Sequence, residues 1–435
     1  MSNTIDAREA TLADVLAARE KRVACQRDLL ARFGKPVVCL TLNIAGPVKV
    51  NAETAYAFRV GANRLTEGLK TMGFPVLAEE TLASVAGKEW LAAVDAPAPA
   101  LKRLCVFLEE LDELGRLFDM DVIAPDGWKL ERGAERRCLV CGLPGRGCAS
   151  RRVHPVAEIQ AVTWRIIREH RLRDSAKRMA QLTVQSLLDE VCVTPKPGLV
   201  DRADNGSHRD MDIFTFNASA AALWPYFEAC YLAGARDAAL PEADAFRRLQ
   251  TLGIDAERRM RAATRDVNTH KGAIFTLGIL CGAAGRIGTA EPDAWLRACA
   301  ALAGSYRAEG VRAEAADGLP SVRNIGLPAL RRAKESGLSL NDQGLSVLLA
   351  LLAGVRDTNM IARGGAEAAE EVRRQAEQLL EARSRGEEAR SLRDLMDEMN
   401  RAYIARNLSP GGCADLLAAT LLVDRASQTP ELMGL

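Results

Sequence analysis

The sequence of 435 residues has little of what marks several large protein classes. It has only 4 histidines and 5% aromatic residues, and 58 Lys and Arg are balanced by 57 Asp and Glu. The longest apolar runs fall short of the 18 or so residues that a transmembrane helix needs, and the balanced charge provides no global field to hold a nucleic acid. We therefore expect neither a membrane nor a nucleic acid among the partners.

Common signature motifs are missing as well. The sequence contains no G-x-x-x-x-G-K-[ST] phosphate loop, no G-x-G-x-x-G after an expected strand, and no H-E-x-x-H. The N-terminus lacks the apolar core of a signal peptide, and the 11 cysteines are an odd number, five of them in apolar surroundings. This pattern favours reduced, buried thiols in a cytoplasmic protein over a disulfide framework.

The sequence does contain two regions of different character, so we expect a multidomain protein. Residues 1–160 predict an α/β domain, with strands at 37–42 and 117–124 and a helix beginning after Pro99. Residues 179–435 predict an all-α domain, because long Ala/Leu-rich periodic segments dominate there. A basic segment, 161–178, connects them. It is either a solvated helix or a groove for a phosphate-bearing partner, and both interpretations remain open.

The strongest local signal in the first domain is the segment Gly115–Val122. On a strand, Asp119 and Asp121 share one face, while the apolar residues between them face the core. Two such carboxylates can hold Mg²⁺, which bridges a polyphosphate, and Arg116 can neutralise phosphate charge nearby. An exposed strand face with two solvated aspartates explains the same pattern.

Two other segments of this domain are candidate sites. Asn43 and Lys49 follow the first strand, at a position where α/β layers often bind nucleotides, although a plain Gly-Pro turn fits the segment too. Cys138, Cys141, Cys148 and His154 form C-x2-C-x6-C-x5-H. These four ligand types could form a structural zinc site, or the segment could be a loop that happens to carry thiols.

In the helical domain, polar clusters recur at the ends of the expected helices. Each cluster alone is explained as a cap or a turn. If these helix ends converge, they instead predict a Mg²⁺-polyphosphate pocket within an α-bundle. The clusters are Lys196–Asp201, Asp210 with Asp212, Asp266–Gly272, Arg312, Arg323, Asp357–Asn359 with Arg363, and Ser409–Gly412 with Asp415.

These motifs resemble two enzyme families. Asn43–Lys49, Gly115–Val122 and Cys138–Cys141 resemble the holo-citrate lyase synthase family, whose members are phosphoribosyl-dephospho-CoA transferases. The second set resembles the triphosphoribosyl-dephospho-CoA synthase family. Its segments are Lys196–Asp201, His208–Asp212, Asn268–Gly272, Asp357–Asn359 with Arg363–Gly365, and Ser409–Asp415. The chain therefore resembles a fused, bifunctional form of the two.

The second resemblance implies that the all-α domain joins ATP and 3′-dephospho-CoA into 2′-(5″-triphosphoribosyl)-3′-dephospho-CoA and releases adenine. It implies Asp201 and Asp266 as catalytic residues and Asp210, Asp212, Asp357 and Asp415 as Mg²⁺ ligands. The implied substrate-binding residues are Lys196, Asn268, His270, Lys271, Arg312, Arg323, Asn359, Arg363, Gly411 and Gly412.

The first resemblance implies a nucleotidyltransferase-type α/β domain that attaches this product to a serine of the apo-acyl carrier protein, the gamma subunit of citrate lyase, and releases pyrophosphate. Arg116, Asp119 and Asp121 would be catalytic, with the two aspartates holding Mg²⁺, and Asn43 and Lys49 would bind substrate. Two alternatives remain: the equivalent maturation of malonate decarboxylase, and a zinc-stabilised interaction protein on a helical scaffold.

Overall fold

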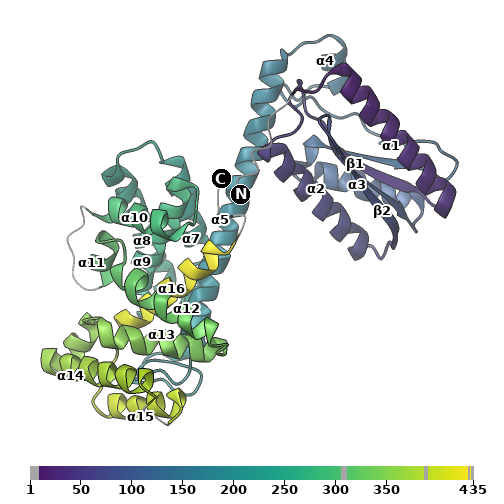
Figure 1. Cartoon of the computed structure of the whole chain (residues 1–435). Helices are drawn as coiled ribbons and strands as arrows, with labels where there is room; N and C mark the ends of the chain where they lie inside the picture. Colours follow the sequence, from purple (N-terminus) through teal and green to yellow (C-terminus); the bar gives the residue numbers. More distant parts are fainter. Residues whose placement is uncertain (1–8, 305–310, 387–389, 430–431, 433–435) are drawn as a thin grey trace. The chain divides into compact units, whose positions relative to one another are not determined.

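The computed structural model describes residues 9–304, 311–386, 390–429 and 432. The chain forms two compact units, Met1–Arg171 (unit 1) and Leu172–Leu435 (unit 2), and each is described by itself (Figure 1).

Unit 1 is a mixed α/β unit built on a four-stranded sheet. Its elements are α1 (Leu12–Phe33), β1 (Val37–Leu42), α2 (Ala52–Thr71), β2 (Val76–Ser84), β3 (Gly87–Val94), α3 (Ala98–Glu110), η1 (Gly115–Leu117), β4 (Phe118–Ile123) and α4 (Gly145–Ser150). The two predicted strands and the helix after Pro99 are confirmed. The strand order is β2-β3-β1-β4 and every neighbouring pair is antiparallel. The argument from parallel α/β layers for the segment after β1 therefore does not apply.

Helices cover both faces of this sheet. Leu29 of α1 packs against Val37, Cys39 and Leu91 on one face. The other face packs against α2 and α3, and the buried side chains of β4 belong to that core. Along β4, buried and partly exposed residues alternate, so Asp119 and Asp121 lie on the face opposite the core residues of the strand, as predicted.

Helix α5 (Val156–Cys192) begins in unit 1 and ends in unit 2, and it contains the predicted basic connector. Ile166 and Ile167 are buried in the core of unit 1, whereas residues from Ala176 onward join the core of unit 2. His170 fixes the first half, because its ring is hydrogen-bonded to Tyr56 Oη at 2.8 Å and to Arg64 at 2.9 Å. The division between the units thus falls inside a continuous helix.

In the part of unit 2 that the structure describes, every regular element is helical, as predicted. After α5 the elements are α6 (Ile213–Ala222), α7 (Trp224–Arg236), α8 (Glu242–Ala263), α9 (Lys271–Ile287), α10 (Pro292–Ala303), α11 (Val311–Ala316), η2 (Val322–Gly326), α12 (Leu327–Glu335), α13 (Leu340–Gly354), α14 (Thr358–Ser384), α15 (Leu392–Ala405) and α16 (Gly411–Ser427). The apolar segment 216–232 is split at Leu223, because Pro225 at the start of α7 cannot donate a helical hydrogen bond.

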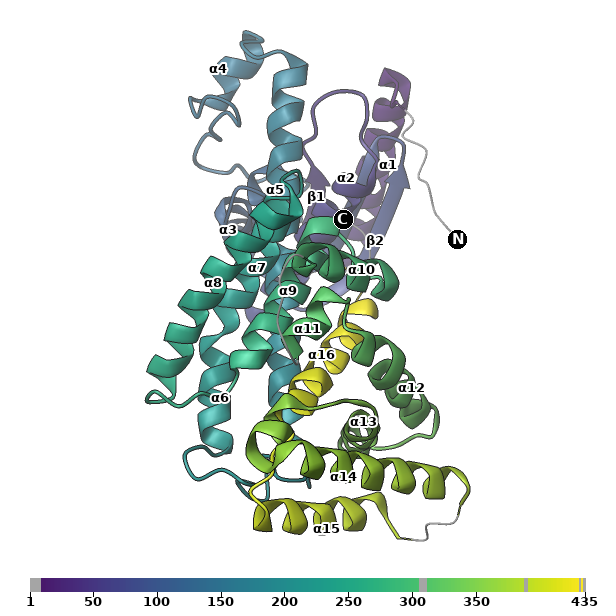
Figure 2. The same cartoon turned by 90° about the vertical axis from the view of Figure 1, so that its left-hand side faces the viewer.

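Three apolar helices form the centre of unit 2. Most residues of α9, α13 and α16 are buried, and α16 (yellow) runs among α9, α12 and α13 (Figure 2). Glycine permits the closest approach, between α7 and α9, since a Cβ at Gly234 would lie 1.9 Å from the carbonyl oxygen of Gly282. Among the described helices, none is by itself both long and apolar enough to cross a membrane. Two bent pairs, α9 with α10 and α13 with α14, meet those criteria only when each pair is taken together.

Candidate functional site

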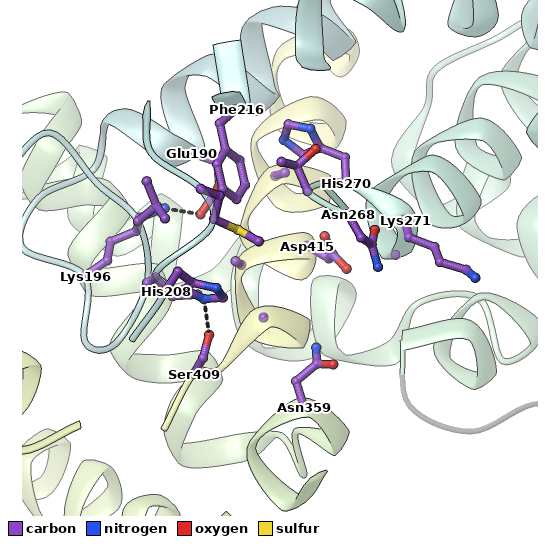
Figure 3. Close-up of a pocket in the computed structure, with 18 of the residues that line it drawn as sticks. Glu190, Lys196, His208, Phe216, Asn268, His270, Lys271, Asn359, Ser409 and Asp415 are labelled. Atoms are coloured by element: carbon purple, nitrogen blue, oxygen red, sulfur yellow. Dashed lines mark hydrogen bonds and ion pairs between the residues drawn. The ribbon is translucent and has the colours of Figure 1, made fainter. Parts of the chain in front are cut away.

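Unit 2 contains a cavity of about 400 Å³ that is lined by residues from distant parts of the sequence (Figure 3). Its volume is within the usual range for a small-molecule site. Eight predicted substrate or metal residues line it: Lys196, Asn268, His270, Lys271, Asn359, Arg363, Gly411 and Asp415. These residues come from four of the five sequence segments that resemble the synthase family, and the lining residue His208 comes from the fifth. The tertiary structure therefore brings all five segments to one cavity, as predicted.

Three helices begin at this cavity. Lys271, Thr358 and Gly411 are the first residues of α9, α14 and α16, and all three line the cavity. A helix N-terminus carries unpaired N–H groups and the positive end of the helix dipole, so it favours an anion. With Lys196, Lys271 and Arg363 on the same walls, the cavity is suited to several phosphate groups.

Asp357 joins two of these helix ends. Its carboxylate accepts from the N–H groups of Asn359 and Met360 in the first turn of α14, and also from the N–H of Cys413 in α16 at 2.8 Å. Burial raises the pKa of Asp357, and these hydrogen bonds oppose that effect. Asp357 was predicted to bind Mg²⁺. In the structure it is the N-cap of α14 and does not line the cavity.

A buried ion pair between Lys196 and Glu190 forms one wall. Lys196 is 1% exposed and Glu190 is 4% exposed, so each charge depends on the other for compensation. Burial raises the pKa of Glu190, while the ammonium of Lys196 lowers it. Glu190 is at the end of α5 and was not predicted as a site residue. It belongs to no motif, and no signal in the sequence separates it from the neighbouring carboxylate of Asp189.

The loop that carries Lys196 is held in place by side chains that do not line the cavity. Asp201 accepts from the backbone N–H of Lys196 at 2.8 Å and from that of Ala203 at 2.6 Å. Asn400 of α15 accepts from the N–H of Gly198 at 2.9 Å. Asp201 was predicted to be catalytic; in the structure its carboxylate accepts hydrogen bonds that fold the loop, and it does not line the cavity.

Asp415 is the one predicted acidic residue on the cavity wall. It lies over Gly272, where a Cβ would be 1.9 Å from a carboxylate oxygen, so a larger residue there would displace the carboxylate. Burial raises the pKa of Asp415 well above its ordinary value, as do the nearby charges of Glu190 and Asp357. In the described part of the chain, no ion pair joins Asp415 to a cation.

An aromatic pair closes another side of the cavity. The rings of Phe216 and His270 meet edge to face at 83°, with centroids 4.9 Å apart. His270 is 3% exposed and its Nδ1 is hydrogen-bonded to Ser219 at 2.7 Å, while no described residue is a partner for Nε2. Burial lowers the pKa of His270 to about 3, and Lys196 acts in the same direction. The imidazole is therefore neutral at ordinary pH.

His208 and Ser409 also line the cavity and were not predicted by residue, although both lie in the quoted segments. Arg363 donates to His208 Nδ1 at 3.2 Å, and His208 Nε2 is hydrogen-bonded to Ser409 at 3.0 Å. Burial lowers the pKa of His208, and the Arg363 guanidinium lowers it further. This chain of hydrogen bonds connects the 196–212 loop to the start of α16.

The remaining predicted residues of unit 2 do not line the cavity. Asp212 is the N-cap of α6, and Asp210 is exposed. Asp266 is exposed and pairs with Arg261 at 3.0 Å, and Arg323 pairs with Asp293 at 2.8 Å. A helix cap thus accounts for the predicted metal ligand Asp212, and surface pairs account for the predicted catalytic residue Asp266 and the predicted substrate-binding residue Arg323. Gly412 is buried in α16 beside the lining residue Gly411, and the side chain of Arg312 lies outside the described residues.

In unit 1 the predicted acidic pair lies on edge strand β4. Asp119 pairs with Arg136 at 3.3 Å and Asp121 pairs with Lys129 at 2.6 Å. Arg116 donates to the carbonyl oxygens of Arg137 and Cys138, each at 3.0 Å. Both carboxylates are therefore already close to cations, and the guanidinium of Arg116 holds the following loop.

A second, smaller cavity of about 260 Å³ lies between α1 and the sheet. Its charged lining residues are four cations, Arg19, Arg22, Lys49 and Lys88, and one carboxylate, Glu89. Thr41 also lines it and is the direct partner of Asp119 in the β1–β4 ladder, so Asp119 is on the same sheet face. Burial lowers the pKa of Lys49. Asn43, predicted alongside Lys49, is exposed and does not line this cavity.

The predicted zinc ligands lie together. The ligand atoms of Cys138, Cys141, Cys148 and His154 are all within 4.8 Å of one another. The five cysteines expected to be buried thiols, Cys39, Cys105, Cys230, Cys281 and Cys299, are buried and unpaired.

Two family models together match most of the chain. Residues 10–170 match the family of apo-citrate lyase phosphoribosyl-dephospho-CoA transferase. Residues 176–303 and 289–432 match the family of ATP:dephospho-CoA triphosphoribosyl transferase. The two matches meet inside α5, close to the division between the structural units.

Relatives show the same fusion. The chain is 32% identical to a Haemophilus influenzae protein named Protein CitXG, over 94% of this chain and 95% of the relative. It is 30% identical to the Leuconostoc mesenteroides Protein CitXG, over 95% and 97%. A Pectobacterium atrosepticum 2-(5″-triphosphoribosyl)-3′-dephosphocoenzyme-A synthase is 40% identical over 60% of this chain and 94% of the relative. The chain thus belongs to the family of bifunctional enzymes that join a phosphoribosyl-dephospho-CoA transferase for citrate lyase to a triphosphoribosyl-dephospho-CoA synthase.

Proposed function

We propose that the cavity of unit 2 binds ATP and 3′-dephospho-CoA and joins them with release of adenine. The observation that carries this proposal is the convergence of three helix N-termini with Lys196, Lys271 and Arg363 on one cavity. Such a cavity suits a triphosphate, because backbone N–H groups and cations can contact several phosphate oxygens at once.

The reaction forms one glycosidic bond and breaks another. The ribose 2′-hydroxyl oxygen of dephospho-CoA attacks the anomeric carbon of the ATP ribose, and the bond to adenine breaks with its electron pair going to the adenine ring. The hydroxyl proton needs an acceptor, and adenine gains a proton as it leaves. Positive charge develops on the ribose in the transition state, as in glycoside hydrolysis.

We assign the proton-accepting role to Glu190. Its carboxylate lines the cavity, and burial raises its pKa, which makes it a better base than an exposed glutamate. Lys196 keeps it ionised before the reaction and is itself close enough to the cavity to contact a phosphate. The sequence had indicated Asp201 and Asp266 as catalytic residues. Neither of them lines the cavity, whereas Glu190 does.

Asp415 is the residue that would hold Mg²⁺ together with the substrate phosphates. It fits because its partly buried carboxyl group lies between helix N-termini, has a raised pKa and has no paired cation among the described residues. Mg²⁺ commonly takes one or two protein carboxylates and completes its shell with phosphates and water. When bound there it would supply positive charge to the triphosphate.

The adenine base is assigned to the face of Phe216. Phe216 is the one aromatic Phe, Tyr or Trp side chain on the described wall of the cavity, and His270 supports its ring edge to face. A purine can stack on such a face, because the contact is made between the two ring systems.

In unit 1 we propose the second transfer, by nucleotidyltransferase-type chemistry. A serine oxygen of the acyl carrier protein attacks the α-phosphorus of the triphosphate, the bond to the β-phosphate breaks, and pyrophosphate leaves with the electron pair. Asp119 and Asp121 would hold Mg²⁺ for this step, and Arg116 would neutralise charge next to them. The four cations of the second cavity, on the same sheet face, would bind the substrate phosphates.

The decisive experiment separates the two steps. The full chain is incubated with ATP, Mg²⁺ and dephospho-CoA, and free adenine is measured by chromatography. Formation of ADP or AMP in place of adenine would contradict glycosyl transfer. Apo-acyl carrier protein of citrate lyase is then added, and its mass and the released pyrophosphate are followed. A competing carrier protein of malonate decarboxylase tests the choice of partner, since preferential loading of that carrier would overturn our assignment.

A further inference from the structure

Four metal-type ligands gather in unit 1, outside both proposed substrate cavities. Cys138 and Cys141 precede the short helix α4, Cys148 lies within it, and His154 follows it. Their ligand atoms all lie within 4.8 Å of one another. Across the described ranges, no other group of three or more His, Cys, Asp or Glu side chains comes this close.

The histidine carries a second, independent observation. Its Nε2 is buried and has no hydrogen-bond partner among the described residues, while its Nδ1 lies 3.1 Å from Glu158 Oε2. A carboxylate at Nδ1 holds the proton on that nitrogen and leaves the lone pair on Nε2. This carboxylate–histidine arrangement is the usual support of a metal-bound imidazole, because it fixes both the tautomer and the ring orientation.

We propose that the chain binds one Zn²⁺ through the Sγ atoms of Cys138, Cys141 and Cys148 and the Nε2 atom of His154. Sulfur and imidazole ligands select zinc over the hard cation Mg²⁺. Four protein ligands fill a tetrahedral shell, so this is a structural site with no position for substrate. As each Zn–S bond forms, the thiol gives up its proton to the solvent.

The alternative chemistry for these thiols is a disulfide between Cys141 and Cys148, whose sulfur atoms are 3.4 Å apart. A disulfide would use two of the four groups and leave Cys138 and the buried Nε2 of His154 unexplained. Sulfur atoms bound to one tetrahedral zinc ion are roughly 3.7 Å apart, so the observed spacing also suits a shared metal.

The ion would position residues of the acidic face on β4. Arg116 donates to the carbonyl oxygens of Arg137 and Cys138. Cys138 is the first proposed zinc ligand, and Arg137 directly precedes it. Arg136, two residues before that ligand, pairs with Asp119 at 3.3 Å. Zinc closes residues 138–154 into a loop and so fixes the segment that carries Arg136. Loss of zinc should therefore impair the transfer in unit 1 and leave the cavity of unit 2 unaffected.

The primary test is the metal content of the unmodified full-length chain, purified without chelators from zinc-supplemented cells. Elemental analysis should give about one zinc per chain, and Co²⁺ exchange should give the intense visible bands of a tetrahedral thiolate site. A chain that contains no zinc and takes up none when titrated in the reduced state would overturn the proposal. So would a Cys141–Cys148 disulfide found by mass spectrometry in freshly purified protein.

Variants then test the ligands one by one. Cys148→Ser should lose the zinc, whereas Cys25→Ser, which changes a partly buried free thiol of α1, should keep it. Glu158→Gln should keep one zinc at saturation but bind it about 10–100-fold more weakly. The control for that change is Glu131→Gln, which removes an exposed carboxylate. Full zinc occupancy and affinity in Cys148→Ser would contradict the ligand set.

An activity measurement connects the ion to its position. After removal of zinc with a zinc-selective chelator and restoration of Mg²⁺, carrier loading should fall at least about tenfold while adenine release stays unchanged. Equal loss of both activities would contradict a role confined to unit 1. Failure of the proposed transferase reactions would leave the metal content unchanged, so the two proposals can fail separately.

Discussion

The two units place their charged groups in opposite settings. In unit 2, Glu190, Lys196 and His270 are buried and Asp415 is partly buried, and all four line a cavity at which three helices begin. In unit 1, Asp119 and Asp121 are partly exposed on an edge strand, each paired with a cation. The difference teaches that helix N-termini can make an enclosed anion site with few charges, because backbone N–H groups supply much of the potential. An open strand has no such backbone contribution and depends on charged side chains.

The same difference appears in the pKa values. Burial raises the pKa of Glu190 and Asp415 and lowers that of His270. A buried carboxyl group is more easily neutralised, so the arrival of a cation or a proton changes its state. The pKa shifts in unit 2 thus follow from burial, whereas the two aspartates on β4 are each paired with a cation.

The largest expected effect comes from Asp119→Asn, which removes a carboxylate from the proposed Mg²⁺ site of unit 1. We expect carrier loading to fall by about 10³-fold, since metal-ion charge stabilisation contributes several kcal/mol. Adenine release should be unchanged, because that step is assigned to unit 2.

Asp28→Asn is the matched control for this change, since Asp28 is an exposed carboxylate of α1 paired with Arg32. Equal loss of adenine release and carrier loading in Asp119→Asn would show that the two reactions are not divided between the two units.

Glu190→Gln tests the proton acceptor in unit 2. The turnover number for adenine release should fall by about 10²-fold or more, because a general base commonly contributes that much. Loading of the carrier from preformed triphosphoribosyl-dephospho-CoA should be unchanged. Thermal unfolding must be measured in parallel, since the buried charge of Lys196 loses its partner. A folded variant with normal turnover would remove Glu190 from the mechanism.

Asp415→Asn tests the proposed metal role of the second carboxyl group on the cavity wall. We expect the Mg²⁺ concentration that gives half-maximal adenine release to rise by about tenfold or more, because an amide is a weaker ligand than a carboxylate. The measurement is a Mg²⁺ titration at saturating ATP. Asp255→Asn on α8, a partly exposed residue paired with Arg259 outside the cavity, is the control. An unchanged Mg²⁺ requirement would contradict the assignment.

Lys271→Ala removes a cation from the first residue of α9. The KM for ATP should rise about tenfold, consistent with the loss of one charge-assisted hydrogen bond, while the turnover number changes little. Steady-state kinetics with varied ATP measure this. Lys334→Ala on α12 removes a cation outside the cavity and should leave the KM unchanged. Identical KM values for the two variants would take Lys271 out of the phosphate site.

The smallest expected effect concerns stability against pH. Burial lowers the pKa of His270 to about 3 from 6.5, so the unfolded chain takes up this proton first as the pH falls. The contribution of His270 to the free energy of unfolding is complete above pH 6.5 and falls by about 1.4 kcal/mol per pH unit below it. Denaturant unfolding between pH 7.5 and 5 should therefore give a shallower slope for His270→Gln than for the parent chain. Parallel slopes would contradict the buried, neutral imidazole.

Much of the local structure could be predicted because short-range chemistry decides it. The alternation of Phe118, Met120 and Val122 with two aspartates gave the two faces of β4, and the apolar periodicity around Leu345 gave the buried helix α13. The break between α6 and α7 at Leu223 is likewise local, because its cause, Pro225, is visible in the sequence. The antiparallel order of the sheet was not accessible from strand patterns, because pairing depends on residues far apart in the chain.

The site was predicted in part for a similar reason. Motifs beside helix starts correctly marked Lys271, Asn359 and Asp415 as residues of the cavity. The same residue types at Asp212 and Asp357 proved to be helix caps, because Asp is favoured both as a cap and as a ligand. Glu190 was overlooked since it belongs to no motif and acts through its burial.

The sequence by itself determined which segments become helices and strands, the division into an α/β and an all-α region, and the residue types that can meet phosphate, magnesium and zinc. These properties follow from local periodicity and side-chain chemistry. Only the tertiary structure decided which aspartate faces the cavity and which cap a helix, and which nitrogen of His154 has no hydrogen-bond partner among the described residues. Those outcomes depend on burial and on the meeting of helix ends, and both are set by packing between residues that are remote in sequence.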